Sequence, residues 1–404
     1  MSNPHASSQS TLTISKWVLV LLASISAITP LAIDMYLPAM QAIAQDLNSN
    51  IAIVQNSLSS YLLGFAIAML FCGPIADVLG RRPMAIFGLL GFSLASFALS
   101  HVTTIEGFLF VRTCQAVAGG AAAIVAPGII RHIYGEHAAK GLSYVSMIMM
   151  VAPMVAPSLG SLLLEISDWR AIFSFQAAYG TIILIAAIFC LPEIPKREKN
   201  ASWPVLFFAS YKTVFSTASI RPYLMAGICA SFAFFSYLTA IPFVYMDVFG
   251  VSAQFFGILF GINVIGLFFA NFINTRFVVK LGSKQMLAYA TITAMLSGFG
   301  LLLFNWFGLG IYYTVVTTVV LMASLIIISV NADALILMKF PEHTGTASAA
   351  IGTLRFGIGS LSGPVLAITF TGTPVPFSAL MFSAVFVIAV CQLYARSTNS
   401  DVEG

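Results

Sequence analysis

The sequence predicts an all-α polytopic membrane protein with twelve transmembrane helices, arranged as two six-helix bundles. Two observations carry this prediction: 59% of the 404 residues are hydrophobic, and only 8% are Asp, Glu, Lys or Arg. A helix needs about 20 mostly apolar residues to cross the hydrocarbon core of a bilayer. Apolar runs of that order cover residues 17–40, 51–74, 83–101, 104–128, 142–165, 170–191, 222–246, 252–277, 285–304, 309–338, 346–370 and 376–395.

The positions of Lys and Arg orient the chain, because cytoplasmic loops carry an excess of these residues. With both termini in the cytoplasm, only Arg170 falls on the outer side, while Arg112 and Arg355 lie within spans. We therefore expect a multi-pass protein of a bacterial inner membrane. The cations then placed inside are Lys16, Arg81, Arg82, Arg131, Lys140, Lys196, Arg197, Lys199, Lys212, Arg221, Arg276, Lys280, Lys284, Lys339 and Arg396.

Composition narrows the function classes. The net charge of +4 is spread over several short loops with no basic stripe, so no nucleic-acid partner is expected. The five cysteines form no CxxC pair and are expected to pack as small apolar residues, so no metal site is predicted. The chain has no GxxxxGK[ST] loop, which argues against drive by ATP. We expect membrane lipid as its surroundings, and a monomer suffices.

One break of some length divides the chain, between the sixth and seventh apolar runs. Its first part is charged and contains prolines, as in a flexible linker. Its second part, from Trp203 to Phe215, mixes aromatic residues with Lys212, and either lies flat at the membrane interface or is simply solvated. The expected division is a cytoplasmic tail (1–16), a first bundle (17–191), a cytoplasmic linker (192–220), a second bundle (221–395) and a cytoplasmic tail (396–404).

The connection between the second and third runs reads GPIADVLGRRPM, starting at Gly73. Gly73 permits close helix approach and Gly80 suits a tight turn, while Asp77 can hold loop arginines or a helix terminus. Control of topology by the two arginines alone is the alternative. We predict a charged conformational gate formed by Gly73, Asp77, Gly80, Arg81 and Arg82.

The same connection has an echo in the second half of the chain. TRFVVKLGSKQM begins at Thr275, 202 residues after Gly73, and matches in Leu-Gly, the following cation and the final Met. Half the chain length separates the two segments. This spacing is expected for two bundles related by an axis along the membrane normal.

The loop segment resembles the signature Gly-x-x-x-Asp-x-x-Gly-Arg-Arg of the major facilitator superfamily. Arg112-x-x-Gln115 resembles that superfamily's fourth-helix motif, although Ala116 replaces the usual Gly. A run with Pro153, Pro157 and Gly160 resembles the fifth-helix motif of its drug–proton antiporter branch. This resemblance implies two bundles that expose a central cavity to each side of the membrane in turn.

Further runs resemble the Bcr/CflA drug-resistance subfamily. They are AIDMYLPA from Ala32, PFVY from Pro242, and GTASA from Gly345 after Phe340-Pro341. The chain departs from that pattern at Asp333, where members of the subfamily are usually apolar, and at Arg355, where they often carry Gln. A charge of each sign in the second half favours a polar substrate over a generic lipophilic drug.

Asp34 and Arg112 are the candidates for proton coupling. Ionisable groups inside membrane spans are costly and are functional candidates by default. Asp34 lies about 18 Å of helix rise from Asp46, and Arg112 about 9 Å from Glu106, so both lie well below the outer surface. The family resemblance ties both positions to coupling. A static ion pair is the alternative for each.

Asp333 and Arg355 lie about 9 Å and about 15 Å from the cytoplasmic loop that they share. They either pair with each other or bind a charged or zwitterionic substrate. Pro153, Pro157 and Gly160 are expected to form the antiporter hinge, with ordinary tolerance of proline in membrane helices as the alternative. The predicted substrate cavity comprises Tyr36, Asp333, Arg355, Asn263, Asn331, Phe235 and Tyr237, although interhelical hydrogen bonding is the more usual role of such asparagines.

These features predict a transporter that exports a small organic compound in exchange for protons, with no cofactor and the proton gradient as its energy source. The compound is expected to be a drug, a siderophore-like molecule or another polar or amphiphilic metabolite. Proton-coupled uptake on the same fold is the main alternative. A membrane-embedded enzyme or a sensor is a remote one, since the chain contains neither HExxH nor GxSxG.

Overall fold

The computed structural model describes residues 16–134, 138–193, 216–340 and 344–400, which form helices and short connections with no strand among them. The tails 1–15 and 401–404 and the expected interfacial segment from Trp203 to Phe215 lie outside these residues. The first half contains α1 (Lys16–Asp34), η1 (Leu37–Ala39), α2 (Met40–Asp46), α3 (Ile51–Leu79), α4 (Arg81–Leu99), α5 (Ile105–Ala123), α6 (Val125–Tyr134), α7 (Ala138–Ile166) and α8 (Trp169–Cys190).

The second half of the chain is built in the same way from long helices with short interruptions. It contains η3 (Ala218–Ile220), α10 (Arg221–Pro242), η4 (Phe243–Val248), α11 (Ala253–Trp306), α12 (Ile311–Leu337), α13 (Thr344–Gly359), α14 (Ser362–Ile368) and α15 (Val375–Ser400).

All twelve expected spans fall on helices. Within the described part of the chain, ten helical segments are long and apolar enough to cross a membrane. One of them, α11, has 54 residues and covers two expected spans, because its backbone leaves the helical conformation at Gly282. A shorter apolar segment, Val151–Ile166, accounts for the fifth span.

Some spans expected to be continuous are broken. The α-helix of the first span ends at Asp34 and is followed by the 3₁₀ turn η1 and the short helix α2, and residues Trp17–Asp46 together form one candidate membrane span. Pro38, inside η1, lacks the backbone N–H that a continuing α-helix would use. The break leaves Asp34 as the last residue of α1, at a point where the chain changes direction.

The internal repeat is visible in the backbone. Gly80, between α3 and α4, has φ 103° and ψ 146°, and Gly282, within α11, has φ 76° and ψ 157°. Residues with a Cβ rarely adopt this region. The two glycines are 202 residues apart in the sequence, so matching turns lie at matching places in the two halves.

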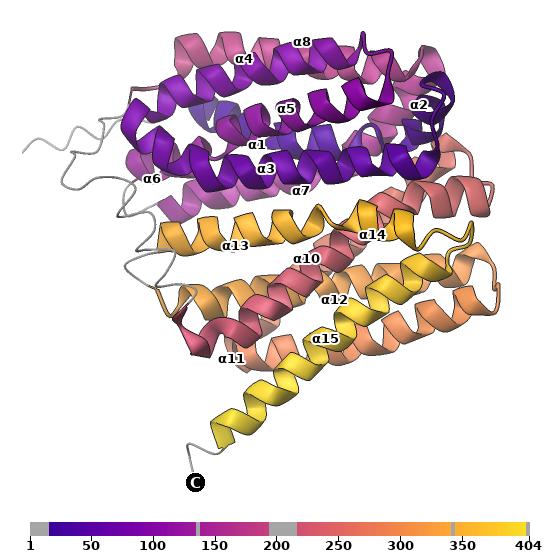
Figure 1. Ribbon diagram of the computed structural model, residues 1–404. Helices are drawn as coiled ribbons and strands as arrows, with labels where there is room; N and C mark the ends of the chain where they lie inside the picture. The colour runs from indigo at the N-terminus through magenta and orange to yellow at the C-terminus, as the bar shows by residue number, and fades with distance from the viewer. Residues whose placement is uncertain (1–15, 135–137, 194–215, 341–343, 401–404) are drawn as a thin grey trace, which may run out of the picture.

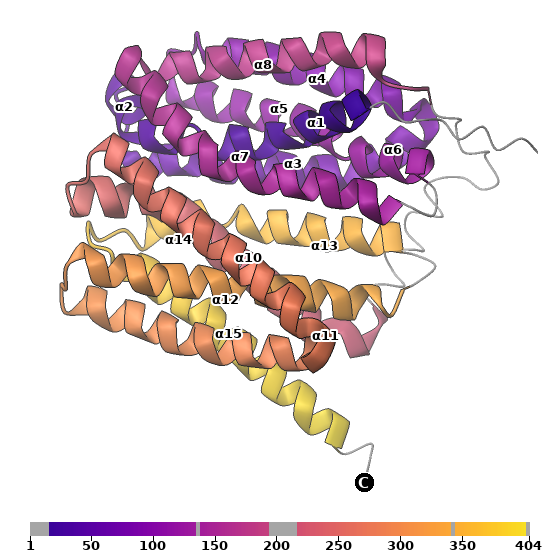
Figure 2. The ribbon, with the colours of Figure 1, turned by 180° about the vertical axis from the view of Figure 1, so that it is seen from behind.

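The halves lie side by side as two layers of helices, with α1 to α8 in one and α10 to α15 in the other (Figure 1). Across the boundary between them, α3 packs against α13 and α14, and α7 packs against α11. The reverse view shows α7 crossing close to the first part of α11 (Figure 2). The line between the halves is where a central cavity of this architecture would open.

Contacts between the halves are hydrogen-bonded at the end of the molecule that carries α2. Gln41 donates to the Asp247 carboxylate, Ser161 donates to the backbone carbonyl of Ala253 over 2.9 Å, and the N–H of Gly363 donates to Ser59 over 2.9 Å. The end of α8 and the start of α10 lie at the opposite end (Figure 1). The structure is therefore joined at the end expected to face outward.

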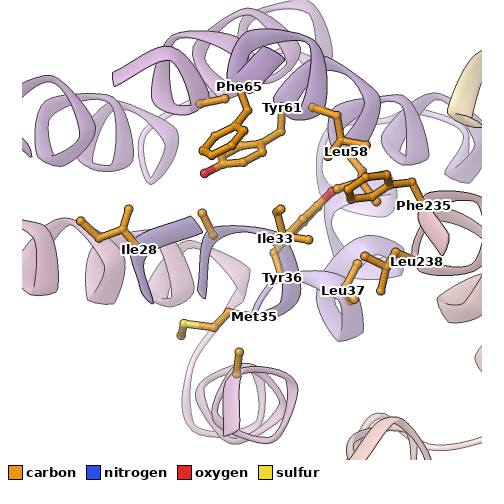
Figure 3. Packing of buried hydrophobic residues seen from close by; sticks show 14 of the residues in the cluster. Ile28, Ile33, Met35, Tyr36, Leu37, Leu58, Tyr61, Phe65, Phe235 and Leu238 are labelled. Carbon is orange, nitrogen blue, oxygen red and sulfur yellow. The ribbon is translucent and has the colours of Figure 1, made fainter. Parts of the chain in front are cut away.

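Apolar packing continues along this boundary. The rings of Phe65 on α3 and Phe356 on α13 lie 4.6 Å apart, centroid to centroid. Phe235 and Leu238 of α10 reach the cluster that contains Leu58 (Figure 3). These contacts bury apolar side chains of both halves in one core.

Gly160 gives α7 a close approach to the break after α1. A Cβ at this position would overlap the backbone carbonyl of Met35. The expectation that Gly160 permits close packing is therefore confirmed. The contact fixes α7 against the residue that follows Asp34.

Candidate functional site

Arg112 is a fully buried cation in the first bundle, with an exposed fraction of 0%. It extends from α5 and donates hydrogen bonds to the side-chain oxygen of Gln115 over 2.6 Å and to the backbone carbonyl of Ala32 over 3.1 Å. Its Nε has no hydrogen-bond partner within the described residues. The backbone bond ties α5 to the last turn of α1.

Aromatic rings surround the Arg112 guanidinium. Its carbon lies 4.2 Å from the ring centroid of Tyr36, 4.8 Å from that of Tyr61 and 5.6 Å from that of Phe173. We call these three residues the aromatic cage. A desolvated cation–π contact contributes about 2 kcal/mol or more, so the cage offsets part of the cost of burying the charge. Figure 3 shows Tyr36 and Tyr61 on facing elements.

A chain of polar contacts extends from Arg112 to three other helices. Gln115 donates to Ser96 of α4 over 2.8 Å and to Gln176 of α8 over 2.9 Å. Gln176 in turn donates to the backbone carbonyl of Leu31 over 3.4 Å. Buried networks of this kind fix one arrangement of the helices that they join. Helices α1, α4, α5 and α8 are thereby held around one charge.

Asp34 is also buried, with an exposed fraction of 4%. Within the described part of the chain, its carboxyl has no hydrogen bond and no ion pair. It lies within electrostatic range of Tyr61 in its own half and of Tyr237 in the other half. A buried carboxyl that no protein group holds in place is available for proton exchange.

The two residues predicted to couple protons both lie within electrostatic range of Tyr61 and do not form an ion pair in this conformation. Arg112 bonds to the carbonyl of Ala32, two residues before Asp34, and not to the Asp34 carboxylate. The alternative reading of a static ion pair between them does not describe this structure. Their role in coupling stays a prediction.

Tyr237 of the second half lies within electrostatic range of Asp34, and Asn263 lies beside Tyr237. Their exposed fractions are 1% and 3%, and Tyr237 stacks on Phe260 with centroids 6.2 Å apart. The Tyr237 hydroxyl lies close to the Asn263 side chain but without the geometry of a hydrogen bond. Neither the hydroxyl nor either polar atom of the amide has a hydrogen-bond partner among the described residues.

Asp333 and Arg355 form an ion pair, with 2.7 Å between Asp333 Oδ2 and Arg355 Nη1. Arg355 also donates to the backbone carbonyl of Ser329 over 3.1 Å and lies against Gly227. Both side chains are partly exposed, at 30% and 17%. Asp333 Oδ1 and Arg355 Nε have no partner within the described residues, so each ion keeps unused hydrogen-bonding capacity.

Three other residues predicted for the cavity have different surroundings. Asn331 donates to Asn274 over 2.6 Å, which is the interhelical bonding considered as its alternative role. Tyr36 belongs to the aromatic cage, and its hydroxyl accepts a bond from Ser57 over 3.1 Å. Phe235 packs on Phe356 with centroids 5.4 Å apart. Phe356 in turn packs on Phe65 of the first half, so Phe235 reaches the boundary through Phe356.

The predicted gate is only partly described. Gly80 makes the expected turn, and Arg81 lies over Gly128, where a Cβ would overlap its guanidinium. Arg82 pairs with Glu193 over 2.7 Å and donates to the backbone carbonyl at position 188 over 2.7 Å. The second bond satisfies a carbonyl near the end of α8.

Gly73 and Asp77 belong to the same segment. A Cβ at Gly73 would meet only Ile124, at an ordinary 3.7 Å, so the expected close helix approach at Gly73 is wrong for this conformation. The side chain of Asp77 lies outside the described part of the structure. Its part in a gate stays a prediction.

The predicted hinge prolines lie within a continuous helix. Pro153 and Pro157 are both inside α7, which runs unbroken from Ala138 to Ile166. Pro157 is buried and Pro153 is half-buried. The hinge function stays a prediction, since one conformation shows only the position of these residues.

Tyr61, Phe173 and Gln176 are the residues that sequence reasoning missed. Gln176 could have been identified from the sequence, because an amide within an apolar span needs a hydrogen-bond partner. Tyr61 and Phe173 carried none, because the sequence is rich in aromatic residues and most of them pack against lipid or core. Only the fold shows which aromatic rings surround Arg112.

We expect Tyr61→Phe and Tyr61→Leu to separate the two parts of this side chain. The Phe variant keeps the ring beside Arg112 and loses a hydroxyl that has no hydrogen-bond partner among the described residues, so its thermal unfolding midpoint in detergent should match the wild type. The Leu variant loses the cation–π contact, and should be less stable by about 1–2 kcal/mol. Equal midpoints for both variants would contradict a stabilising role of the cage.

Comparison with known proteins agrees with this architecture. The family model described as Major Facilitator Superfamily matches residues 22–364. In solved structures, the fold is similar to the nucleoside transporter NupG (TM-score 0.71, 16% identity, 94% of this chain and 98% of that one) and to a D-xylose-proton symporter (TM-score 0.73, 12% identity, 92% and 97%). At these identities, the similarity concerns the fold alone.

Relatives of known sequence include a bicyclomycin resistance protein homolog of Haemophilus influenzae, 30% identical over 95% of this chain and 97% of that protein. The transporter YdgK of Bacillus subtilis is 32% identical over 90% and 91%. The multidrug resistance protein MdtL of Vibrio parahaemolyticus is 37% identical over 42% and 43%. With the fold and the family match, these similarities establish that the chain is a membrane transporter that belongs to the Major Facilitator Superfamily.

Proposed function

We propose that this transporter exports a small organic compound in exchange for protons, and that Asp34 is the residue that takes up and releases the proton. The observation that carries the proposal is the buried Asp34 carboxyl, which has no partner among the described residues, at the end of a helix that Arg112 binds through the Ala32 carbonyl. An arginine keeps its own charge, so it can influence the neighbouring acid without exchanging a proton itself.

The exchange follows from competition for one site. On the outer side, Asp34 takes a proton and the compound leaves. On the cytoplasmic side, the proton leaves and the compound binds. The contacts from Gln41 to Asp247 and from Ser161 to Ala253 close the outer end in the state that receives substrate from the cytoplasm.

The names of the relatives support the substrate class. A bicyclomycin resistance protein homolog and a multidrug resistance protein are similar to this chain, so a drug-like compound is the proposed cargo and bicyclomycin is the first to test. We place the protein in the bacterial inner membrane with both termini in the cytoplasm, on the basis of its Lys and Arg distribution. The proton gradient supplies the energy, and no cofactor takes part.

Proton release on substrate binding tests the exchange directly. Bicyclomycin added to the purified protein in weakly buffered detergent should acidify the solution, because the compound and the proton exclude each other at Asp34. Asp34→Asn should abolish the acidification. Glu106→Gln, which changes an exposed acid in the first turn of α5, is the matched control and should retain it. Binding without proton release in the wild type would sink the competition mechanism.

Exchanging the charges of the second-half ion pair tests whether Asp333 and Arg355 bind substrate or only each other. Either single change, Asp333→Asn or Arg355→Gln, leaves one charge without its partner and should lower the thermal unfolding midpoint. Asp333→Arg combined with Arg355→Asp restores an ion pair. We expect the double variant to regain stability but to transport substrate at less than about a tenth of the wild-type rate, since ligand charges meet the wrong partners. Full transport by the double variant would assign the pair a structural role.

A further inference from the structure

We propose that Tyr237 and Asn263 form a recognition subsite for an amide-like group of the exported compound, that is, an N–H donor next to a carbonyl acceptor. The proposal rests on the export function proposed above, and it names the chemistry that this transporter selects. It places a specific polar contact in the second half of the chain, across from Asp34.

The starting observation is a buried side chain with no partner. Asn263 is 3% exposed, and both its Oδ1 and its Nδ2 have no hydrogen-bond partner in the described part of the chain. Such an atom is costly to bury, and native structures contain few. A buried amide with both polar atoms unused therefore needs an explanation, and a ligand is one that this transporter supplies.

Other buried amides of the same half are satisfied, which makes Asn263 the exception among them. Asn331 and Asn274 bond to each other over 2.6 Å. Asn305 donates to Ser378 over 2.9 Å and accepts from Thr314 over 2.9 Å. The fold thus provides partners where an asparagine joins helices, and provides none for Asn263.

The surroundings of Asn263 have the form of a binding surface. Phe260 lies one turn away on α11, and Tyr237 of α10 stacks on its ring. The Tyr237 hydroxyl, close to the amide, is a second buried polar group without a partner. Asp34 lies within electrostatic range across the boundary between the halves. Two rings and two unused polar groups therefore lie together, and one of them, Tyr237, is within electrostatic range of Asp34.

The chemistry of these groups selects an amide. A side-chain amide offers one acceptor and a donor NH₂ group, so it can form two parallel hydrogen bonds with the edge of a ligand amide. The Tyr237 hydroxyl can add a third bond in either direction. A ligand carboxylate, which only accepts, would leave the Asn263 oxygen unpaired and would face the charge of Asp34. The subsite therefore favours an uncharged amide over an acid.

The compound reaches this surface when the halves separate on the cytoplasmic side. In the present conformation, Tyr237 and Asn263 are covered because the halves meet, and the hydrogen bonds at the outer end hold them together there. Alternating access opens the boundary from one side at a time. Opening from the cytoplasm would expose the amide while the outer end stays closed.

A pair of probes that differ only in the amide N–H groups tests the proposal. The probes are the cyclic dipeptide of phenylalanine and serine and its N,N′-dimethyl derivative, titrated calorimetrically into the purified full-length protein in detergent. The wild type should bind the N–H probe about tenfold more tightly or better, because the methylated probe leaves buried groups of the subsite unpaired. Asn263→Leu should reduce the ratio to near one. Asn271→Leu, at a half-buried position of the same helix, should leave it unchanged.

Thermal unfolding without ligand excludes a purely structural reading. Asn263→Leu removes an amide without a hydrogen-bond partner among the described residues, so its midpoint should equal or exceed that of the wild type, whereas loss of a structural bond would lower it. The proposal is overturned if neither probe binds, if the wild type binds both equally, or if Asn263→Leu keeps the preference. Proton release that is indifferent to N-methylation would overturn the subsite and leave proton exchange standing. A preserved preference for the N–H probe without proton release would support the subsite and overturn proton exchange at Asp34.

Discussion

The burial of the Arg112 charge is the constraint on which the first bundle depends. A guanidinium inside an apolar bundle is tolerated only when nearby groups accept its hydrogen bonds and stabilise its charge. Here the side chain of Gln115 and the carbonyl of Ala32 accept its hydrogen bonds, and the aromatic cage stabilises its charge. Because those partners come from different helices, satisfying one cation also sets the positions of α1, α3, α5 and α8. The end of α1, where Asp34 lies, is part of that arrangement.

The charges within the spans are held in different ways. Arg112 is bound by Gln115 and the Ala32 carbonyl, and Asp333 is bound by Arg355, whereas Asp34 is held by nothing in the described structure. A fixed charge beside a free carboxyl suits a transporter, because one group must stay constant while the other changes its protonation. The same contrast recurs among the asparagines of the second half, where Asn263 alone of the buried amides considered has no partner. Unused polar groups of both halves thus meet at the boundary that alternating access opens.

The sequence predicts the features that depend on local properties, such as apolar length and turn residues, and misses those that depend on how the helices pack. Apolar length predicted every span, and the Leu-Gly match predicted equivalent turns, which Gly80 and Gly282 make with similar backbone angles. The break after Asp34 was missed, although Pro38 was a local signal for it. The aromatic cage was out of reach, because nothing in the sequence distinguishes Tyr61 from aromatic residues that face lipid. The lack of a hydrogen-bond partner at Asp34 and Asn263 could not be predicted either, since it depends on which side chains the fold places around them.

The most direct test of the central claim is transport driven by a pH gradient in proteoliposomes. Vesicles with an acidic lumen should accumulate labelled bicyclomycin through the wild-type protein, as protons leave and the compound enters. Asp34→Asn should lose this accumulation yet still exchange labelled for unlabelled compound, because binding and alternation remain while the proton site is gone. Accumulation by Asp34→Asn in response to the pH gradient would contradict the assignment of proton exchange to this residue.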